Sequence, residues 1–407
     1  MNIAFLYLHA PDESMGSIYR IKNLCQGLNS TTHKVYIFSP YRYSQNWGPN
    51  VEFVTISSIS RGGKISSFIY SVIRKILNSR FLAKYTILNP RFLQLTVKRI
   101  AKGISEAMKT QGLKLDVFIG ESELAGLILL NQKNNLECKI ITDFQNFWPE
   151  ELVEHNIIKR KSKRYKFLMD LEEKILKESD KIITPSVALK EFLTQNFKII
   201  EEKKIIPVIN GGEPLVENPT KKEFPPKIIN SGMVVHRSNL ELFLKSIPYI
   251  LKEYPETEIY ITRKGEELKR IMKLAEDMDL AINFYWKDTF DEYIKLLKKC
   301  HIGVVTSSEE LTRSLGFVTK IYDYFALGIP VVGNDIGGWT SIIEEAKLGL
   351  LSKSEPEDLA NKILELLKNP DLMYEYGKNG IKLLNTEYNI ENSGQNLLKV
   401  VQETLEN

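Results

Sequence analysis

Short apolar runs alternate with amphipathic stretches in the first half of the chain. Residues 2–8 form a β-branched and aromatic run, residues 18–28 have helical spacing, and residues 33–40 form a second apolar run. The same order of strand, loop and helix continues in residues 116–130 and 138–152. This order is typical of β-α-β units, in which parallel strands are connected by helices.

The pattern is interrupted after residue 205 and then starts again. Residues 205–227 contain five prolines and two glycines, a composition that favours a linker between domains. We therefore predict an α/β protein with two Rossmann-like, doubly wound domains that face each other across a cleft. The predicted boundaries are residues 1–210 for the first domain and residues 211–387 for the second, and the tail of the chain ends in another predicted helix.

Polar residues follow the predicted strands of the first domain, at the edge where parallel sheets bind ligands. His9 and Gly16 lie in the loop after the first strand, where a glycine would let a ligand approach the backbone closely. Glu121 and Glu123 follow one later strand, and Asp143 follows the next. Capping of the following helices is the alternative role for such polar side chains.

Basic, aromatic and glycine residues follow the predicted strands of the second domain. They are Gly232, Arg237, Arg263, Lys264, Tyr285, Trp286 and Glu309. Several separate basic sites favour a dianionic or diphosphate ligand, and Tyr285 with Trp286 would flank a flat base. For Arg263 and Lys264 the alternative is a solvated turn.

Residues 314–338 combine a glycine-containing turn, a predicted helix, an Ala-x-Gly-x-Pro break, a short apolar strand and a glycine pair. Backbone N–H groups at the start of a helix are unpaired, and such groups bind phosphate. Lys320 adds a positive charge there, and Asp323, one helical turn further, would accept hydrogen bonds from hydroxyl groups. An ordinary surface turn and core helix would also explain this spacing.

The composition excludes several other classes of protein. The chain has 407 residues, of which 43% are hydrophobic and 26% charged, as in globular proteins with more than one core. Three isolated cysteines and five histidines show neither zinc nor disulfide spacing, so we expect a reducing compartment and no metal. Without a signal peptide or an apolar run of about 18 residues, we expect a cytoplasmic protein.

Positive charge is concentrated in residues 53–105, which contain ten Lys and Arg residues and no Asp or Glu, although the whole chain carries only +4. Its apolar residues at helical spacing are Ile65, Ile69, Val72 and Ile76. A basic amphipathic segment favours contact with an anionic membrane surface, which we expect for residues 61–102. The alternatives are a solvated face and nucleic acid, but no stacking motif specifies nucleic acid.

Residues 314–338 resemble the donor site of GT-B glycosyltransferases, in particular the retaining enzymes of family 4. The family pattern reads Glu-Gly-Phe-Gly, four residues, Glu-Ala-x-Ala-x-Gly-x-Pro and then Asp-x-Gly-Gly. The matching segments of this chain are LGFV at 315–318, DYFALGIP at 323–330 and DIGG at 335–338. Segments similar to other family elements are DKIITPS at 180–186, IPVINGG at 206–212, SGMVVHRSNLELFLKSI at 231–247 and DFQNFWPEE at 143–151. The last resembles an element of enzymes that act on lipid-linked glycans.

The resemblance implies a GT-B fold, in which a helix at about 388–407 returns to the first domain. It also implies transfer of a sugar from a nucleotide-sugar to a hydroxyl acceptor, with retention and without a metal. It implies that Lys320 and Arg237 stabilise the departing diphosphate and that Asp323 holds ribose or sugar hydroxyls. The other donor contacts that it implies are Gly316, Phe317, Val318 and Thr319. A lipid-linked or cell-envelope acceptor would enter past Gly16, Glu121 and Asp143, and Asp143 would be catalytic.

Leu315 is the main departure from the family pattern, because the family has a glutamate that contacts the donor sugar at this position. Glu309 or Glu310, on the same loop, would be the substitute. An epimerase of GT-B fold and a non-catalytic donor-binding subunit are therefore the alternatives. Residues 319–324 (TKIYDY) are similar to an active branch of the family, which favours an enzyme.

Overall fold

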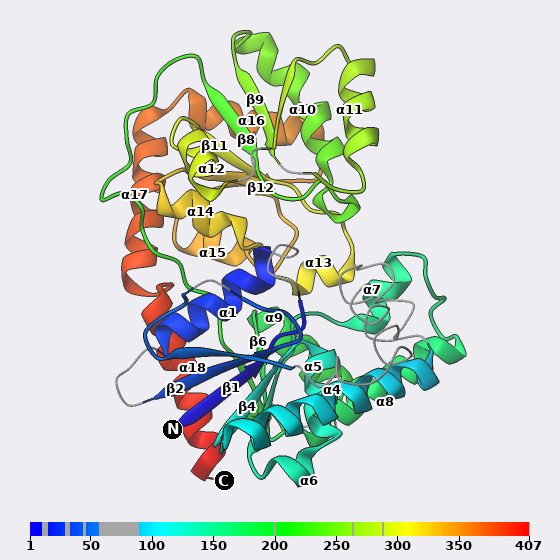
Figure 1. The fold of residues 1–407 in the computed structure, drawn as a ribbon. Helices are drawn as coiled ribbons and strands as arrows, with labels where there is room; N and C mark the ends of the chain where they lie inside the picture. The colour runs from blue at the N-terminus through cyan, green and yellow to red at the C-terminus, as the bar shows by residue number, and fades with distance from the viewer. Residues whose placement is uncertain are drawn as a thin grey trace. The chain divides into compact units, whose positions relative to one another are not determined.

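The computed structural model describes residues 1–9, 15–28, 33–43, 46–56, 89–198, 201–262, 264–286 and 289–406, without the side chains of residues 15–17 and 313. The chain divides into two compact units (Figure 1). The first contains Met1–Asn210 and Ile390–Asn407, and the second contains Gly211–Asn389. The sequence-based boundaries were residues 210 and 387.

The first unit is built on a seven-stranded parallel sheet with the order β3-β2-β1-β4-β5-β6-β7. The strands are β1 (Asn2–Leu6), β2 (Lys34–Ser39), β3 (Val51–Thr55), β4 (Val117–Glu121), β5 (Lys139–Asp143), β6 (Lys181–Thr184) and β7 (Ile205–Pro207). The strand order reverses between β1 and β4, and such a switch point opens a crevice at the carboxyl ends of the strands.

The helices of the first unit connect and cover these strands (Figure 1). They are α1 (Met15–Gly27), α4 (Pro90–Gln111), α5 (Glu123–Leu130), α6 (Lys133–Leu136), α7 (Trp148–Glu154), α8 (Lys163–Glu178), α9 (Val187–Asn196) and α18 (Ile390–Glu406). The α/β class predicted from the alternating pattern is confirmed. Gly16, which we placed in a loop, is instead the second residue of α1.

Helix α18 completes the core of the first unit by packing along α1 (Figure 1). Leu397, Val400 and Val401 join the same core as the residues of β1. The two helices meet at glycines, since a Cβ atom on Gly27 would lie only 2.6 Å from Cα of Gly394. Side chains larger than hydrogen would therefore force the two backbones apart.

The second unit is built on a six-stranded parallel sheet with the order β10-β9-β8-β11-β12-β13. The strands are β8 (Lys227–Asn230), β9 (Glu258–Thr262), β10 (Ile282–Tyr285), β11 (Ile302–Val305), β12 (Val331–Asn334) and β13 (Gly349–Ser352). The switch point lies between β8 and β11. Strands β11 and β12 are wholly buried, as expected for parallel strands covered on both faces.

Helices cover the second sheet in the same way. They are α10 (Leu240–Glu253), α11 (Leu268–Asp277), α12 (Phe290–Leu297), α13 (Leu311–Leu315), α14 (Lys320–Ala326), α15 (Thr340–Glu345), α16 (Pro356–Leu367) and α17 (Pro370–Thr386). Among the helices of the described residues, none has both the length and the apolar character that crossing a membrane requires.

Candidate functional site

Lys320 lies at the switch point of the second sheet. It is the first residue of α14, and its Nζ donates a hydrogen bond of 2.9 Å to Oδ1 of Asn230, the buried last residue of β8. The side-chain nitrogen Nδ2 of Asn230 lies 3.3 Å from Oγ1 of Thr306, which follows β11. Asn230 thus holds the ammonium group between the carboxyl ends of β8 and β11, where the sequence predicted a diphosphate.

Gly232 lies directly beside this ammonium-bearing side chain. Its φ of 103° is strained for any residue with a Cβ atom, and such an atom would lie 3.6 Å from Cδ of Lys320. The backbone here is further held by Tyr324, whose hydroxyl lies 2.9 Å from the amide nitrogen of Ser231. The glycine loop and α14 therefore form one fixed assembly around Lys320.

Asp323 is held by a tyrosine from another helix. The hydroxyl of Tyr293 on α12 donates to Oδ2 of Asp323 at 3.0 Å. Burial raises the pKa of Tyr293 well above its ordinary value, and the charge of Asp323 adds to the shift, so the phenol stays a donor. Lys320 and Asp323, separated by one helical turn, therefore both have fixed partners from outside their helix.

The turn before α14 differs from the predicted phosphate-binding turn. The amide of Gly316 donates to the carbonyl of Thr312 at 3.1 Å, so it is not an unpaired donor as we expected. The ring of Phe317 stacks on Tyr322 with a centroid distance of 5.3 Å. Val318 is buried, and the carbonyl of Thr319 accepts the amide of Tyr322. The expected free N–H group of Gly316 is used inside the protein because α13 ends at this turn, and Gly316 closes the last turn of that helix.

Leu315 and the two acidic residues before it have different environments. Leu315 is buried in the second unit, as an apolar side chain would be. Glu310 directly precedes α13 without capping it, and its carboxylate lies 3.0 Å from Oγ of Ser308 and 3.6 Å from Nε2 of His236. Glu309 is exposed. Of the two substitutes that we considered, Glu310 is the one that reaches the loop after β8.

The remaining predicted donor contacts lie around the same edge. Arg237 is half-buried in the loop after β8, and its carbonyl accepts a hydrogen bond from the amide of Ser308 at 3.2 Å. Lys264 is exposed, and Arg263 lies outside the described residues. Trp286 is 37% exposed and packs against Phe284 rather than Tyr285, because alternate residues of a strand share a face.

Asp143 is the centre of a buried ion pair in the first unit. Nε and Nη2 of Arg20 on α1 bind its two carboxylate oxygens at 2.7 and 2.8 Å, and both side chains are buried. Nη1 of Arg20 donates to the carbonyl of Val208 and to Oδ1 of Asn210, each at 2.7 Å. Asp143 therefore neither caps a helix nor presents a free carboxylate, in contrast to both roles that we considered.

Two further carboxyl groups are buried beside this pair. Burial raises the pKa of Glu121 well above the ordinary range, with Asp143 and Glu123 raising it further and Arg20 opposing them. The pKa of Glu123 is raised to about 8, chiefly by burial, although the amide of Asn146 donates to its Oε1 at 3.1 Å. Such perturbed groups are typical of functional sites, and here they lie at the carboxyl ends of β4 and β5.

The sequence pattern did not indicate Arg20 as a site residue. It lies in an amphipathic helix, where an arginine is usually a solvated surface residue. A buried Asp143 needs a cationic partner, and this need could have indicated an arginine. That partner, however, lies 123 positions away in the sequence. Among the described residues, no group of three or more His, Cys, Asp or Glu side chains is arranged to hold a metal.

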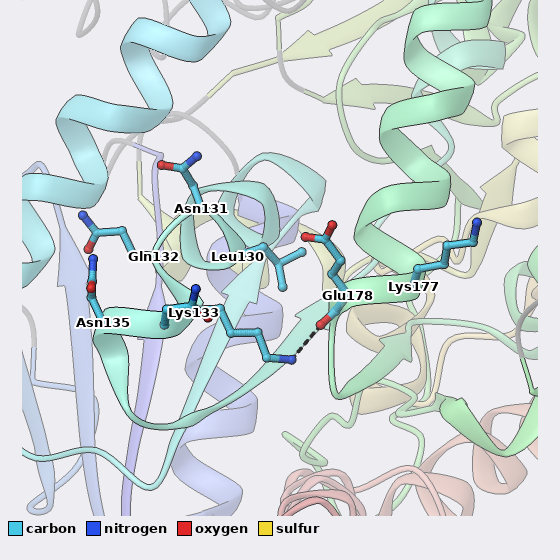
Figure 2. Close-up of a pocket in the computed structure, with 8 residues that line it drawn as sticks. Leu130, Asn131, Gln132, Lys133, Asn135, Lys177 and Glu178 are labelled. Atoms are coloured by element: carbon cyan, nitrogen blue, oxygen red, sulfur yellow. Dashed lines mark hydrogen bonds between the residues drawn. The ribbon is translucent and has the colours of Figure 1, made fainter.

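A polar hollow of about 640 Å³ lies elsewhere on the first unit (Figure 2). It is lined by Leu130–Asn135, Lys177 and Glu178. Lys133 closes one side by donating to the carbonyl of Glu178 at 2.8 Å and pairing with Asp180 at 3.0 Å. Asp180 also accepts the amide of Ile140, so the hollow lies near the amino end of β5, away from the predicted site residues.

The second unit is similar to known proteins. Residues 213–383 match the family described as glycosyl transferases group 1. An uncharacterized glycosyltransferase of Methanocaldococcus jannaschii is 28% identical over 228 residues, which are 55% of this chain. The match spans 60% of the length of that relative.

Solved structures show the same fold over the whole chain. Sucrose-phosphate synthase from Thermosynechococcus elongatus superposes with a TM-score of 0.72 and 16% identity, over 100% of this chain and 99% of that one. The Anabaena protein HepE, solved in complex with UDP, superposes with a TM-score of 0.69 and 11% identity, over 99% and 100% of the two chains. These likenesses confirm the predicted GT-B fold.

Proposed function

We propose that this protein, whose residues 213–383 match the family of glycosyl transferases group 1, transfers a hexose from a nucleotide-sugar to a hydroxyl acceptor with retention of configuration. The observation that carries the proposal is the Lys320–Asn230 pair beside Gly232, at the switch point of the second sheet. The complex of HepE with UDP supports a nucleotide-sugar as the donor.

Each donor residue has a separate task in this proposal. Lys320 and Arg237 stabilise the negative charge that develops on the departing diphosphate, which is the step where preorganised charge lowers the barrier most. Asp323, fixed by Tyr293, accepts hydrogen bonds from ribose or sugar hydroxyls. Since cationic side chains neutralise the charge of the diphosphate, we propose that transfer needs no metal.

The acceptor binds at the edge of the first sheet in this proposal. Asp143 supports that edge through Arg20 instead of contacting the acceptor, because both its oxygens are held. Gly16 lies near the start of α1 at the same end of the sheet. We propose a lipid-linked or cell-envelope glycan as the acceptor, in the cytoplasm at the inner face of the membrane.

The basic segment 61–102 supports the membrane contact. Residues 61–88 lie outside the described residues. On α4, Arg91, Lys98 and Lys102 are exposed, and Lys102 lies 3.7 Å from Glu106. Co-sedimentation with anionic liposomes tests this contact, because a variant with reversed charges in this segment should stay in solution. Equal binding by both proteins would remove the proposal.

A nucleotide-sugar panel, read by mass spectrometry for hydrolysis and transfer, tests the activity. Lys320→Ala should lower turnover at least about tenfold, because it removes a charge that acts in the transition state. Lys295→Ala, at an exposed position of α12, is the matched control. Donor binding without turnover would identify a non-catalytic subunit, and a free epimerised nucleotide-sugar would identify an epimerase.

A further inference from the structure

His9 and Glu121 come together at the switch point of the first sheet. His9 follows β1 by three residues, and Glu121 is the last residue of β4, which pairs with β1. Nε2 of His9 lies 3.7 Å from Oε2 of Glu121. Ligands of doubly wound sheets bind in the crevice at this point, so the pair lies where an acceptor would be bound.

Glu121 itself is too deeply buried to touch an acceptor. Its side chain is only 1% exposed, and its Oε2 has no hydrogen-bond partner. A buried carboxyl oxygen without a hydrogen bond lowers the stability of the folded protein. A functional role for Glu121 would explain why it is present. The charged groups around it are Asp143 from β5, Glu123 from α5 and Arg20 from α1, and Arg20 is engaged with Asp143.

His9 connects this buried carboxyl to the surface. Its side chain is 36% exposed. The hydroxyl of Tyr43 donates to the carbonyl of His9 at 2.7 Å, and the ring of Tyr7 lies 5.5 Å from the imidazole. Tyr43 is in turn stacked on Phe53 from β3. Tyr43 therefore holds the backbone of His9, Tyr7 lies beside its ring, and Nε2 is the ring nitrogen that lies near Glu121.

We propose that His9 is an acceptor-binding residue that donates a hydrogen bond to a sugar hydroxyl oxygen, and that Glu121 is the positioning residue that sets its tautomer. This inference rests on the proposed transferase function. It moves the acceptor contact from Glu121, where the sequence placed it, to a histidine that is accessible.

The protonation of Glu121 determines how the pair works. Burial beside two other carboxyl groups raises its pKa well above the ordinary range, and this shift favours the neutral form of Glu121. A neutral carboxyl group donates its proton to Nε2 of His9 when the two atoms approach to hydrogen-bond distance. The ring proton then resides on Nδ1, which becomes the donor to the acceptor.

Replacement of Glu121 distinguishes this role from simple packing. Glutamine is neutral, has the same shape and donates from its amide, so Glu121→Gln should rescue most of the acceptor KM that Glu121→Ala loses. We expect Glu121→Ala and His9→Ala to raise the acceptor KM about tenfold, with octyl glycosides as acceptors and the nucleotide-sugar that supports turnover. His155→Ala, an exposed histidine of the same unit, is the control.

The pH profile gives a readout that a purely structural role would not move. Wild-type acceptor KM should rise at alkaline pH as Glu121 loses its proton, and Glu121→Gln should lack this rise. A folded Gln variant as impaired as the Ala variant, or an unchanged KM in His9→Ala, would overturn the proposal. Calorimetric binding of UDP and GDP to the same variants reports on the second unit, so failure of the transferase function itself is recognised separately.

Discussion

The hydroxyl of Tyr293 donates a hydrogen bond of 3.0 Å to Oδ2 of Asp323, and this bond joins α12 to α14. Tyr293→Phe should raise the donor KM about tenfold, because a hydrogen bond to a charged group contributes about 1.5 kcal/mol. Steady-state kinetics with varied donor measures this effect. Tyr249→Phe, at an exposed position of α10, should have no effect. An unchanged donor KM in Tyr293→Phe would show that the bond does not position Asp323.

Removal of Arg20 should destabilise the first unit severely. Asp143 would remain buried as an uncompensated charge, and such losses cost about 3–5 kcal/mol. Urea unfolding of Arg20→Met should therefore show a much lower midpoint, whereas Arg91→Met on the exposed face of α4 should not. The double variant Arg20→Met/Asp143→Leu should recover part of the loss, since no charge is left unpaired. A double variant less stable than Arg20→Met would contradict this account.

Glu123 should make stability depend on pH. Its pKa is raised to about 8 in the folded protein, mainly by burial, from an ordinary value of 4.5. The folded state therefore binds the proton more tightly, so this stabilisation is complete below about pH 4.5 and is lost as pH rises to about 8. Above that pH the loss is constant.

Glu123→Gln removes this titration and tests its sign. The difference in urea midpoint between Glu123→Gln and wild type should grow in favour of the variant from pH 5 to pH 8. Glu191→Gln, on the exposed face of α9, serves as the control. A constant difference across this range would mean that Glu123 ionises normally in the folded protein.

Gly394 should tolerate no side chain. A methyl group at the crossing of α1 and α18 would meet the backbone of Gly27, and overpacking of this kind costs about 1–3 kcal/mol. Gly394→Ala should therefore lower the unfolding midpoint, although alanine has the higher helix propensity. Asn396→Ala, an exposed position on the same helix, should be neutral or slightly stabilising. A more stable Gly394→Ala variant would refute the close contact.

Local spacing was sufficient to predict the fold class and the positions of Lys320 and Asp323 on one helix. It did not predict their partners, because Asn230 and Tyr293 lie 90 and 30 positions away. The same limit applies to Arg20, whose role depends on a strand far along the chain. Partners that only tertiary structure brings together leave no periodic signal.

Elements with weak local signals were missed or assigned differently. Strand β7 occupies residues that we assigned to a linker, because the prolines after it obscured the isoleucines that pair with β6. Helix α17 contains Gly377 and Gly380, which lower helix propensity. A Cβ atom on Gly377 would lie 2.2 Å from the carbonyl oxygen of Gly328, so tertiary packing explains this glycine.

The contact of α18 with α1 has a consequence for the order of synthesis. The residues of the second unit, Gly211–Asn389, are all translated before Ile390–Glu406 becomes available to cover α1. The first unit therefore leaves the ribosome with part of its apolar surface exposed, and it matures only after the second unit has been made. We expect this interval to be when the nascent chain is most exposed to aggregation and to binding by chaperones.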